Sequence, residues 1–571
     1  MRLQIPWMHA FLLLAISLPY FVNLGTSSLW DASEAFYAET PREMLASGDY
    51  VAPHFNFAPR VQKPPLAYWI IALSYQLFGI GEFAVRLPGA LAGIGVILFT
   101  YGIARLLYSP RAALMAAAMT ATTARIFILA RRLPIDIFLL FFLIGTLFFL
   151  VHAIRLQKTH WWIAAYFFAA LGFLTKGPVA VIIPAVAVIA WAFIGRRLKA
   201  ADFRFLPGAA VFAAVVLPWY LLVYYRHGWT YIAPFFLRDN LGRFASEDFG
   251  PSRGLLYYFG VGISDFFPWS ILALCACGVL WRCRKTEHPF RSLEYGLPIL
   301  WCAFTFLLFS LSKNKQEYYI APIYPVAAVL MAGVLDKMIE RQTAKSGTAP
   351  RTFQQAPLSW CFWGLGLQAL LLSVFSLSTF YIFRFFMPEI APLYHNIASL
   401  VLVAGCGAFV WSIARRRLAP SLIILTALLW IMYLMCVTVY LPGLERYRPV
   451  KGLCRLIEAQ RDADAEAGYF RTAVPSMAFY LRRPIFEESN AIEMRRRLRS
   501  GKRVFCILSR KSYDSLISDS PDGIYILARQ PRFSMRMDAF LNTRYAQEEE
   551  LLLISNRPAE LIGSAGDRAT S

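Results

Sequence analysis

Long apolar runs constrain the fold of this chain more than any other feature. They recur between residues 7 and 441, and many reach the roughly 18 to 20 residues that a helix needs to cross a bilayer. The whole chain of 571 residues is 58% hydrophobic and only 16% charged. This composition predicts a polytopic α-helical membrane protein with about 13 transmembrane helices. The predicted spans are residues 7–24, 83–107, 112–129, 135–156, 161–175, 178–194, 206–225, 259–281, 297–311, 319–334, 360–383, 397–413 and 422–441.

The distribution of Lys and Arg predicts the orientation of these spans. The net charge is +22, but the basic residues occur in small groups between apolar runs and not on one solvated face, so nucleic acid is not a predicted partner. The richest groups lie in alternate loops, which the positive-inside rule assigns to the cytoplasm. An odd number of spans that starts with a cytoplasmic N-terminus and an uncleaved anchor at 7–24 puts the C-terminus in the periplasm. Arg131 and Arg132 fall on the disfavoured side, which makes them candidates for binding.

Two domains are predicted. Residues 1–442 form the transmembrane domain, and its outer loops 26–82 and 226–258 carry the site, with an interfacial or re-entrant helix at 64–78. Residues 443–571 are a soluble periplasmic α/β domain, with strands at 469–474, 503–508, 523–529 and 551–555 and helices at 494–500 and 511–517. Cys454 and Cys506 both lie in this domain, where an oxidising compartment would allow them to pair.

Each acidic residue predicted at the outer surface has two interpretations, one functional and one structural. Asp31 and Glu34 stand at i and i+3 in a strongly charged loop, which fits a catalytic pair of carboxylates and equally fits a capping box at a helix start. Asp136 follows Pro134 at the top of a predicted span, where the dipole of the first turn stabilises a carboxylate. An ionisable group at the edge of the bilayer is costly, so we favour a functional role for Asp136.

Basic residues on the same face predict an anionic ligand. Lys63, Lys176, Arg238 and Arg243 each fit the alternative of a side chain that snorkels to the interface, but together they can bind a phosphate. The histidines are far apart and no metal-binding motif occurs, so no cofactor is predicted and no divalent metal is indicated. No Walker loop or dinucleotide fingerprint is present, which leaves a lipid-linked or sugar ligand.

Several motifs resemble one known group of enzymes. The outer loop reads LWDASEAFYAETPREMLASGDYVAP and leads to KPPLAYW, and FAVRLPGAL, LTKGPVA and FPWSIL follow it. This pattern resembles the GT-C membrane glycosyltransferases of the protein mannosyltransferase-like superfamily, and most closely the bacterial 4-amino-4-deoxy-L-arabinose lipid A transferases. The resemblance implies an acidic role for Glu34 and Asp136, an aromatic contact by Tyr37, and phosphate binding by Lys63 and Arg243. It departs at Ser33, where the family has an acid, and at Gln62, where the family often has Glu. Two alternatives follow for the missing acid: Asp31 takes over its role, or the acidic role rests on Glu34 and Asp136.

The resemblance also implies a reaction. Such enzymes transfer a sugar from an undecaprenyl-phosphate carrier to an acceptor such as a lipid A-like glycolipid, within membrane lipids at the periplasmic face of the bacterial inner membrane. A carboxylate would act as general base on a hydroxyl acceptor, or would orient the sugar if the acceptor is a phosphate. A protein or glycan mannosyltransferase is the alternative within this class. A lipid or sugar transporter is the alternative outside it, although transporters place their charges near the middle of the membrane.

Overall fold

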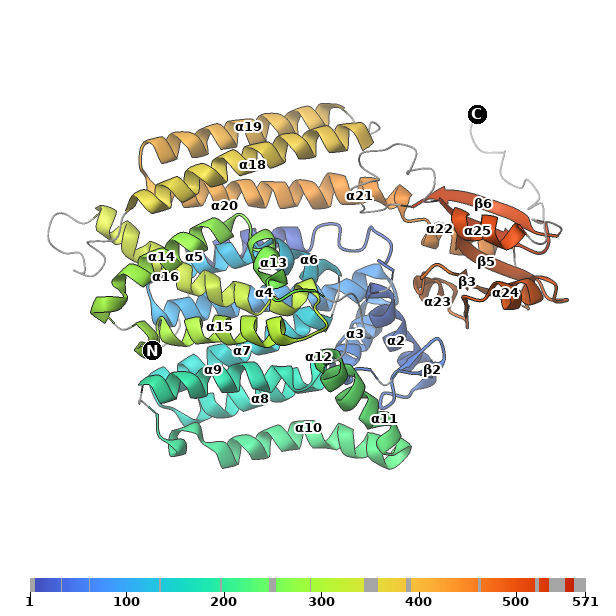
Figure 1. Ribbon diagram of the computed structural model, residues 1–571, viewed down its shortest axis with the longest axis horizontal. Helices are drawn as coiled ribbons and strands as arrows, with labels where there is room; N and C mark the ends of the chain where they lie inside the picture. Colours follow the sequence, from blue (N-terminus) through green and yellow to red (C-terminus); the bar gives the residue numbers. More distant parts are fainter. Residues whose placement is uncertain are drawn as a thin grey trace.

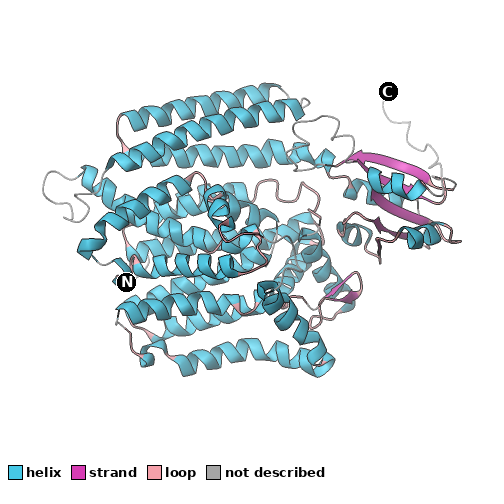
Figure 2. Ribbon diagram, viewed as in Figure 1, coloured by secondary structure: helices cyan, strands magenta, loops and turns pink. Residues whose placement is uncertain are grey.

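The structure is a computed structural model that describes residues 6–31, 33–60, 62–132, 135–195, 198–245, 253–287, 289–343, 358–386, 392–460, 464–518, 523–532 and 550–558. Most of the helices run side by side in one bundle, and the strands are confined to one end of it (Figure 2). The chain enters the bundle through α1 (Trp7–Ser17) and the short helix η1 (Leu18–Tyr20). The first polar loop then forms α2 (Ser33–Ser47), a hairpin of β1 (His54–Phe55) and β2 (Ala58–Pro59), and the apolar helix α3 (Leu66–Phe78).

Within the described residues, five helices are long and apolar enough to cross a membrane, or up to seven if two bent pairs each count as one span. The five are α4 (Glu82–Leu107), α7 (Ile135–Leu156) and the continuous segments Ala201–His227, Glu317–Thr343 and Leu418–Tyr447. Further helices pack beside them: α8 (Thr159–Lys176), α9 (Val179–Gly195), α15 (Gly296–Leu311), α18 (Leu358–Phe386) and α19 (Pro392–Ala414). The protein is therefore a multi-pass helical membrane protein, and the count of about 13 spans stays a prediction.

Two predicted spans are broken. Residues 112–129 divide into α5 (Pro110–Ala121) and α6 (Ala124–Arg132), which meet at 60°, and residues 259–281 divide into α13 (Tyr257–Asp265) and α14 (Trp269–Glu287), which meet at 112°. At the first break the hydroxyls of Thr122 and Thr123 donate to backbone carbonyls four residues back, a pattern that bends helices. At the second, Pro268 has no backbone N–H to continue the helix. Apolar periodicity did not reveal either break.

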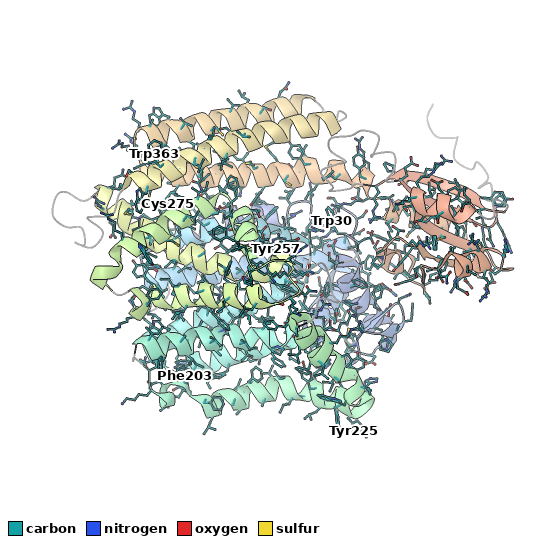
Figure 3. The ribbon with its side chains drawn as sticks, in the orientation of Figure 1. Trp30, Phe203, Tyr225, Tyr257, Cys275 and Trp363 are labelled. Carbon is teal, nitrogen blue, oxygen red and sulfur yellow. The ribbon has the colours of Figure 1, made fainter. Side chains whose placement is uncertain are left out.

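Both polar loops lie at the same end of the bundle. The second loop leaves α10 (Phe205–His227) and forms α11 (Trp229–Ala233), the π-helix η3 (Pro234–Gly242) and α12 (Arg243–Ala245). Figure 1 places α2, α11 and α12 together at the end of the bundle that carries the α/β region. Phe203 and Tyr225 mark the two ends of α10 in Figure 3, so the basic segment before Phe203 lies at the opposite end from these loops.

The C-terminal region is a sheet covered by helices on both faces. The chain reaches it from α20 (Leu418–Met435) through η6 (Cys436–Tyr440), α21 (Leu441–Gly443) and η7 (Leu444–Tyr447). The strand order is β4-β3-β5-β7-β6, in which β4, β3 and β5 are parallel and β7 is antiparallel to β5 and β6. The elements are α22 (Val450–Ala459), β3 (Glu466–Phe470), α23 (Ser476–Leu481), β4 (Phe486–Glu488), α24 (Ala491–Leu498), β5 (Val504–Ser509), α25 (Arg510–Ile517), β6 (Tyr525–Pro531) and β7 (Glu550–Ser555).

Alternating side chains of the central strands fill two cores. Phe505 and Ile507 pack with α22 and α23, whereas Cys506 and Leu508 pack with α24 and α25 on the other face. Burial on both faces explains why these strands are continuous apolar runs. Cys454 belongs to the α22 face and Cys506 to the opposite one, and both thiols are free. The idea that they pair is therefore wrong, because the sheet lies between them. The predicted strand at 469–474 also starts too late, since β3 ends at Phe470.

The first outer loop is fastened to the α/β region by hydrogen bonds. The Asn56 side chain donates to the Ile485 carbonyl at 2.7 Å and accepts from the Ile485 amide at 2.8 Å. The Ser28 amide donates to the Glu445 carboxylate at 3.0 Å. These bonds hold the loop between the bundle and the α/β region, and that position fixes which of its side chains can face a cavity.

Candidate active site

A cavity of about 770 Å³ opens where the two polar loops meet the ends of α6, α7 and α8. Polar and charged side chains line one part of it, and apolar side chains of α6, α7, α9 and α15 line the rest. Six residues that the sequence marked as candidates line this cavity: Tyr37, Lys63, Arg132, Asp136, Lys176 and Arg243. They come from segments more than 200 residues apart in the chain, so only the packing of the helices brings them together.

Asp136 and Lys176 form an ion pair at the rim of the bundle. Asp136 lies in the first turn of α7 and is 7% exposed, and Lys176 is the last residue of α8. The Lys176 ammonium donates to the Asp136 carboxylate and also lies 4.9 Å from the ring centroid of Tyr319 and 5.4 Å from that of Tyr318. The α7 and α8 helices pack along their length, so the pair is held on a rigid scaffold. The two tyrosines were not among the sequence candidates.

A second ion pair comes from the π-helix η3. The Arg243 guanidinium donates to Asp239 at 3.0 Å, one turn earlier, and Asp239 is 7% exposed. The carbonyls of Arg243 and Phe244 accept from the amides of Asn314 and Lys313, at 3.3 and 3.0 Å, which ties this loop to the segment after α15. Single π-helical turns occur often at functional sites. Asp239 was not among the sequence candidates, and its signal is the i, i+4 spacing of Asp and Arg in RDNLGRF.

Lys63 is a cation without a carboxylate partner in this cavity. Its ammonium lies 6.0 Å from the Phe235 ring centroid, and it forms no ion pair with any residue that the structure describes. Burial lowers the pKa of Lys63 to about 7, although the nearby carboxylate of Asp239 acts in the opposite direction. A buried ammonium with no carboxylate in contact is stabilised when a phosphate binds, because the phosphate supplies the missing negative charge.

Tyr37 and Ser33 project from α2 into the same space. Both line the cavity, and the Tyr37 ring stacks on Tyr68 with 5.9 Å between centroids. Ser33 is exposed at the start of α2, in the position where the resemblance implies an acid. Gln62 also lines the cavity. Among the described residues, no three His, Cys, Asp or Glu side chains are grouped closely enough to hold a metal ion.

Glu34 does not line the cavity, which corrects the expectation that it joins the other site residues there. Its side chain is fully buried and receives two bonds from the Arg86 guanidinium, at 2.6 and 3.0 Å. It also accepts from the Trp30 amide at 2.8 Å, which is the reach-back half of the predicted capping box. Arg86 donates in addition to the carbonyls of Ser27 and Ser28 at 2.7 and 2.9 Å. Glu34 thus fixes the loop before α2 through Arg86.

Asp31 and Arg238 also lie outside the cavity lining. Asp31 accepts from the Ser476 amide at 3.0 Å, so it holds the α/β region and does not stand in for the acid that Ser33 replaces. Burial raises the pKa of Asp31, while the bonds from Ser476 act against that rise. Arg238 is exposed on η3, one residue before the buried Asp239. Helical geometry turns neighbouring residues to different sides, and loop sequence alone does not give that direction.

Comparison with known proteins supports the resemblance. A family described as dolichyl-phosphate-mannose-protein mannosyltransferase matches residues 62–222. An enzyme of Edwardsiella ictaluri named undecaprenyl phosphate-alpha-4-amino-4-deoxy-L-arabinose arabinosyl transferase is 33% identical over 338 residues, which are 58% of this chain and 59% of the relative. The enzyme of the same name from Pseudomonas aeruginosa strain UCBPP-PA14 is 32% identical over 331 residues, 57% of this chain and 59% of the relative. The matches thus span about 60% of the length of these relatives.

Solved structures confirm the fold. The crystal structure of ArnT from Cupriavidus metallidurans bound to undecaprenyl phosphate has a TM-score of 0.73 to this chain at 20% identity, and the match covers 96% of this chain and 98% of that one. The chain therefore has the helical GT-C fold with a small sheet region near its C-terminus, as the sequence motifs predicted.

Proposed function

We propose that this protein is a membrane glycosyltransferase that takes a sugar from a polyprenyl-phosphate carrier, undecaprenyl phosphate, and transfers it to a lipid A-like glycolipid. The observation that carries this proposal is the meeting of Lys63, Lys176 and Arg243 with Asp136 and Asp239 in one partly apolar cavity. Cations in such a cavity suit a lipid phosphate, and the carboxylates suit a sugar with hydroxyl or amino groups. The names of the relatives, which describe an aminoarabinosyl transferase with this carrier, point the same way.

The reaction follows from the charges in the cavity. The bond between the sugar C1 and the carrier phosphate oxygen breaks, and a bond from C1 to an oxygen of the acceptor forms. Negative charge then grows on the departing carrier phosphate, and Lys63 and Arg243 are the cations we assign to it. Fixed charges in a cavity shielded from water stabilise that charge better than water does. Tyr37 would contact the sugar beside this phosphate.

The ion pairs suggest the duty of the carboxylates. Asp136 already forms an ion pair with Lys176, and Asp239 forms one with Arg243. A phosphate acceptor is ionised at neutral pH and needs no base to remove a proton, so in that case the carboxylates orient the sugar and its amino group. We therefore favour a phosphate oxygen of the glycolipid as the acceptor atom.

The proposal includes the placement of the chain in its membrane. The N-terminus is cytoplasmic and about 13 spans carry the chain across the bacterial inner membrane. The α/β domain, from about residue 443 onward, and both polar loops are periplasmic. The Lys- and Arg-rich loops that the positive-inside rule assigns to the cytoplasm support this orientation.

Two alternatives make different predictions. A protein or glycan mannosyltransferase is favoured by the family that matches residues 62–222, and it would use a mannose carrier and a polypeptide or glycan acceptor. A transporter would leave the carrier lipid chemically unchanged. Mass spectrometry of carrier lipids and outer-leaflet glycolipids, in cells with and without the gene, separates all three. A glycolipid that gains one sugar only when the gene is present supports our proposal, and unchanged glycolipids together with a modified protein contradict it.

A further inference from the structure

One face of α6 lines the cavity and carries two arginines. Arg125, Ile128, Leu129 and Arg132 all line it, at the i, i+3, i+4 and i+7 spacing of a single helical stripe. The neighbouring Arg131 points elsewhere and donates to the Pro19 carbonyl at 2.6 Å. The stripe thus presents cationic groups beside apolar side chains, which is the surface that a phosphorylated lipid with acyl chains requires.

Among the described residues no carboxylate contacts Arg132, and the opposite charge that acts on it is the Glu34 carboxylate, which is bonded to Arg86. The Arg125 guanidinium forms two bonds to the Asp265 carboxylate, at 2.7 and 2.8 Å. Arg132 forms no hydrogen bond or ion pair with any residue in the described parts of the chain. Its guanidinium lies 4.1 Å from the ring centroid of Trp30.

A second arginine braces the same indole. The Arg448 guanidinium, from the segment that leads into the α/β region, lies 3.5 Å from the Trp30 ring centroid and donates to the Ser28 carbonyl at 3.1 Å. Figure 3 shows Trp30 between the helix bundle and the α/β region. Stacking on a fixed indole holds the plane of the Arg132 guanidinium while its N–H groups stay available.

We propose that Arg132 binds the phosphate of the acceptor glycolipid, in a subsite distinct from the one in which Lys63 and Arg243 hold the carrier phosphate. This inference rests on the proposed function, because it assigns the second anionic substrate of the same cavity. Guanidinium groups recognise phosphate through paired N–H bonds, and an unpaired one is costly to keep in a cavity unless a ligand neutralises it. Ile128 and Leu129 on the same stripe would contact the acyl chains.

The position of Arg132 also suits the reaction. It ends α6, and Asp136, the second residue of α7, follows four residues later, with both side chains in the lining of one cavity. An acceptor phosphate on Arg132 would therefore share this cavity with the carboxylate that we assign to the sugar. Two anionic substrates would otherwise repel each other, and two separate cationic subsites allow them to bind together.

The test uses the full-length protein in nanodiscs and three lipid probes. These are undecaprenyl phosphate, a phosphorylated lipid A-like glucosamine disaccharide, and the same disaccharide without its phosphate. Binding is measured by native mass spectrometry for the wild type, Arg132→Gln and Arg132→Lys. Arg496→Gln serves as the matched control, because Arg496 is exposed on α24 and, among the described residues, forms an ion pair only with Glu493, at 3.0 Å.

We expect Arg132→Gln to bind the phosphorylated disaccharide about 10- to 100-fold more weakly, the effect of losing bonds to a charged group. Its affinity for undecaprenyl phosphate should stay within about twofold of the wild type, which also shows that the variant is folded. Arg132→Lys should recover part of the loss, and the dephosphorylated disaccharide should not distinguish the variants.

The results that would overturn the inference fall into two groups, which reject different claims. Equal binding of the phosphorylated disaccharide by wild type and Arg132→Gln, or a loss of undecaprenyl phosphate binding instead, rejects the role of Arg132 and leaves the proposed function intact. A wild-type protein that binds neither phosphorylated lipid rejects both the inference and the function on which it rests.

Discussion

The ammonium of Lys176 at the end of α8 donates a hydrogen bond to the carboxylate of Asp136 in the first turn of α7. Each residue alone has an ordinary structural explanation, since a carboxylate suits a helix start and a lysine suits a helix end. Neither explanation accounts for the fact that the two residues pair with each other in the lining of the cavity.

Neutralising Asp136 should impair transfer without unfolding the protein. We expect Asp136→Asn to lower kcat by about 100-fold or more, because a preorganised charge in the cavity is lost. Lys176→Gln should have a similar effect, and the double variant should lose less than the product of the two, since the residues act as one unit. Steady-state transfer assays measure this. Asp514→Asn is the control, because it removes the same charge from an ion pair of 3.2 Å with Arg510 on α25.

Binding of the carrier should weaken as the pH rises through neutrality. The pKa of Lys63 is lowered by burial to about 7, so the ammonium that attracts the phosphate is mostly lost by pH 8. We expect affinity for undecaprenyl phosphate to fall about tenfold between pH 6 and pH 8 relative to Lys63→Arg, which stays charged throughout. Both proteins bind the same phosphate, so the ratio of their affinities at each pH cancels the effect of the phosphate's own ionisation. Parallel pH profiles for the two proteins would contradict this assignment.

Glu34 should behave as a structural residue. Glu34→Ala leaves the Arg86 guanidinium buried without its carboxylate, and we expect a loss of about 3–5 kcal/mol in the free energy of unfolding. The double variant Glu34→Leu with Arg86→Met should be less destabilised than the single one, because neither charge remains. Thermal unfolding in detergent micelles checks both. A Glu34→Gln protein that unfolds like the wild type but has lost transfer would return Glu34 to the chemistry.

A buried carboxylate pair on α2 should make stability depend on pH. Glu39 and Glu43 are 0% and 4% exposed, and the single arginine between them, Arg42, bonds to Glu39 at 2.7 Å. Burial and the Glu39 carboxylate raise the pKa of Glu43 to about 7. A raised pKa means that this group stabilises the fold fully below its unfolded value near 4.5 and loses that stabilisation as the pH rises through about 7.

The corresponding variant is Glu43→Gln. It keeps an oxygen for the Phe57 amide, which donates to Glu43 at 3.0 Å, and it cannot ionise. We expect it to melt at a higher temperature than the wild type at pH 8.5 and to lose that advantage at pH 5. The comparison is the difference between the two proteins at each pH, because other groups titrate in both. Glu493→Gln on the exposed face of α24 should show no such trend.

Much of the fold was predictable because it follows from local chemistry. Apolar runs such as 135–156 must be helices in a bilayer, where every backbone group needs an internal partner, and α7 covers those residues. The break between α5 and α6 was missed because hydroxyl back-bonding at Thr122 and Thr123 does not change the apolar pattern. The break between α13 and α14 was missed because the apolar run continues through Pro268, although proline lacks the N–H that a helix needs there. In the sheet region, the predicted strands at 503–508 and 551–555 match β5 and β7 to within one residue at each end. Their continuous apolar runs indicate burial on both faces, but they do not indicate which helix covers which face.

The sequence by itself determined that this chain is a bundle of membrane helices and that two strongly charged loops interrupt its apolar runs. It also identified Lys63, Arg132, Asp136, Lys176 and Arg243 as candidates, because ionisable groups beside apolar runs are costly wherever the chain folds, and the family resemblance added Tyr37. Only the tertiary structure decided that Asp239 joins them while Glu34, Asp31 and Arg238 stay outside the cavity lining. The physical reason is that the direction of a loop side chain depends on which distant helix packs against it, and that packing is not encoded in any local spacing.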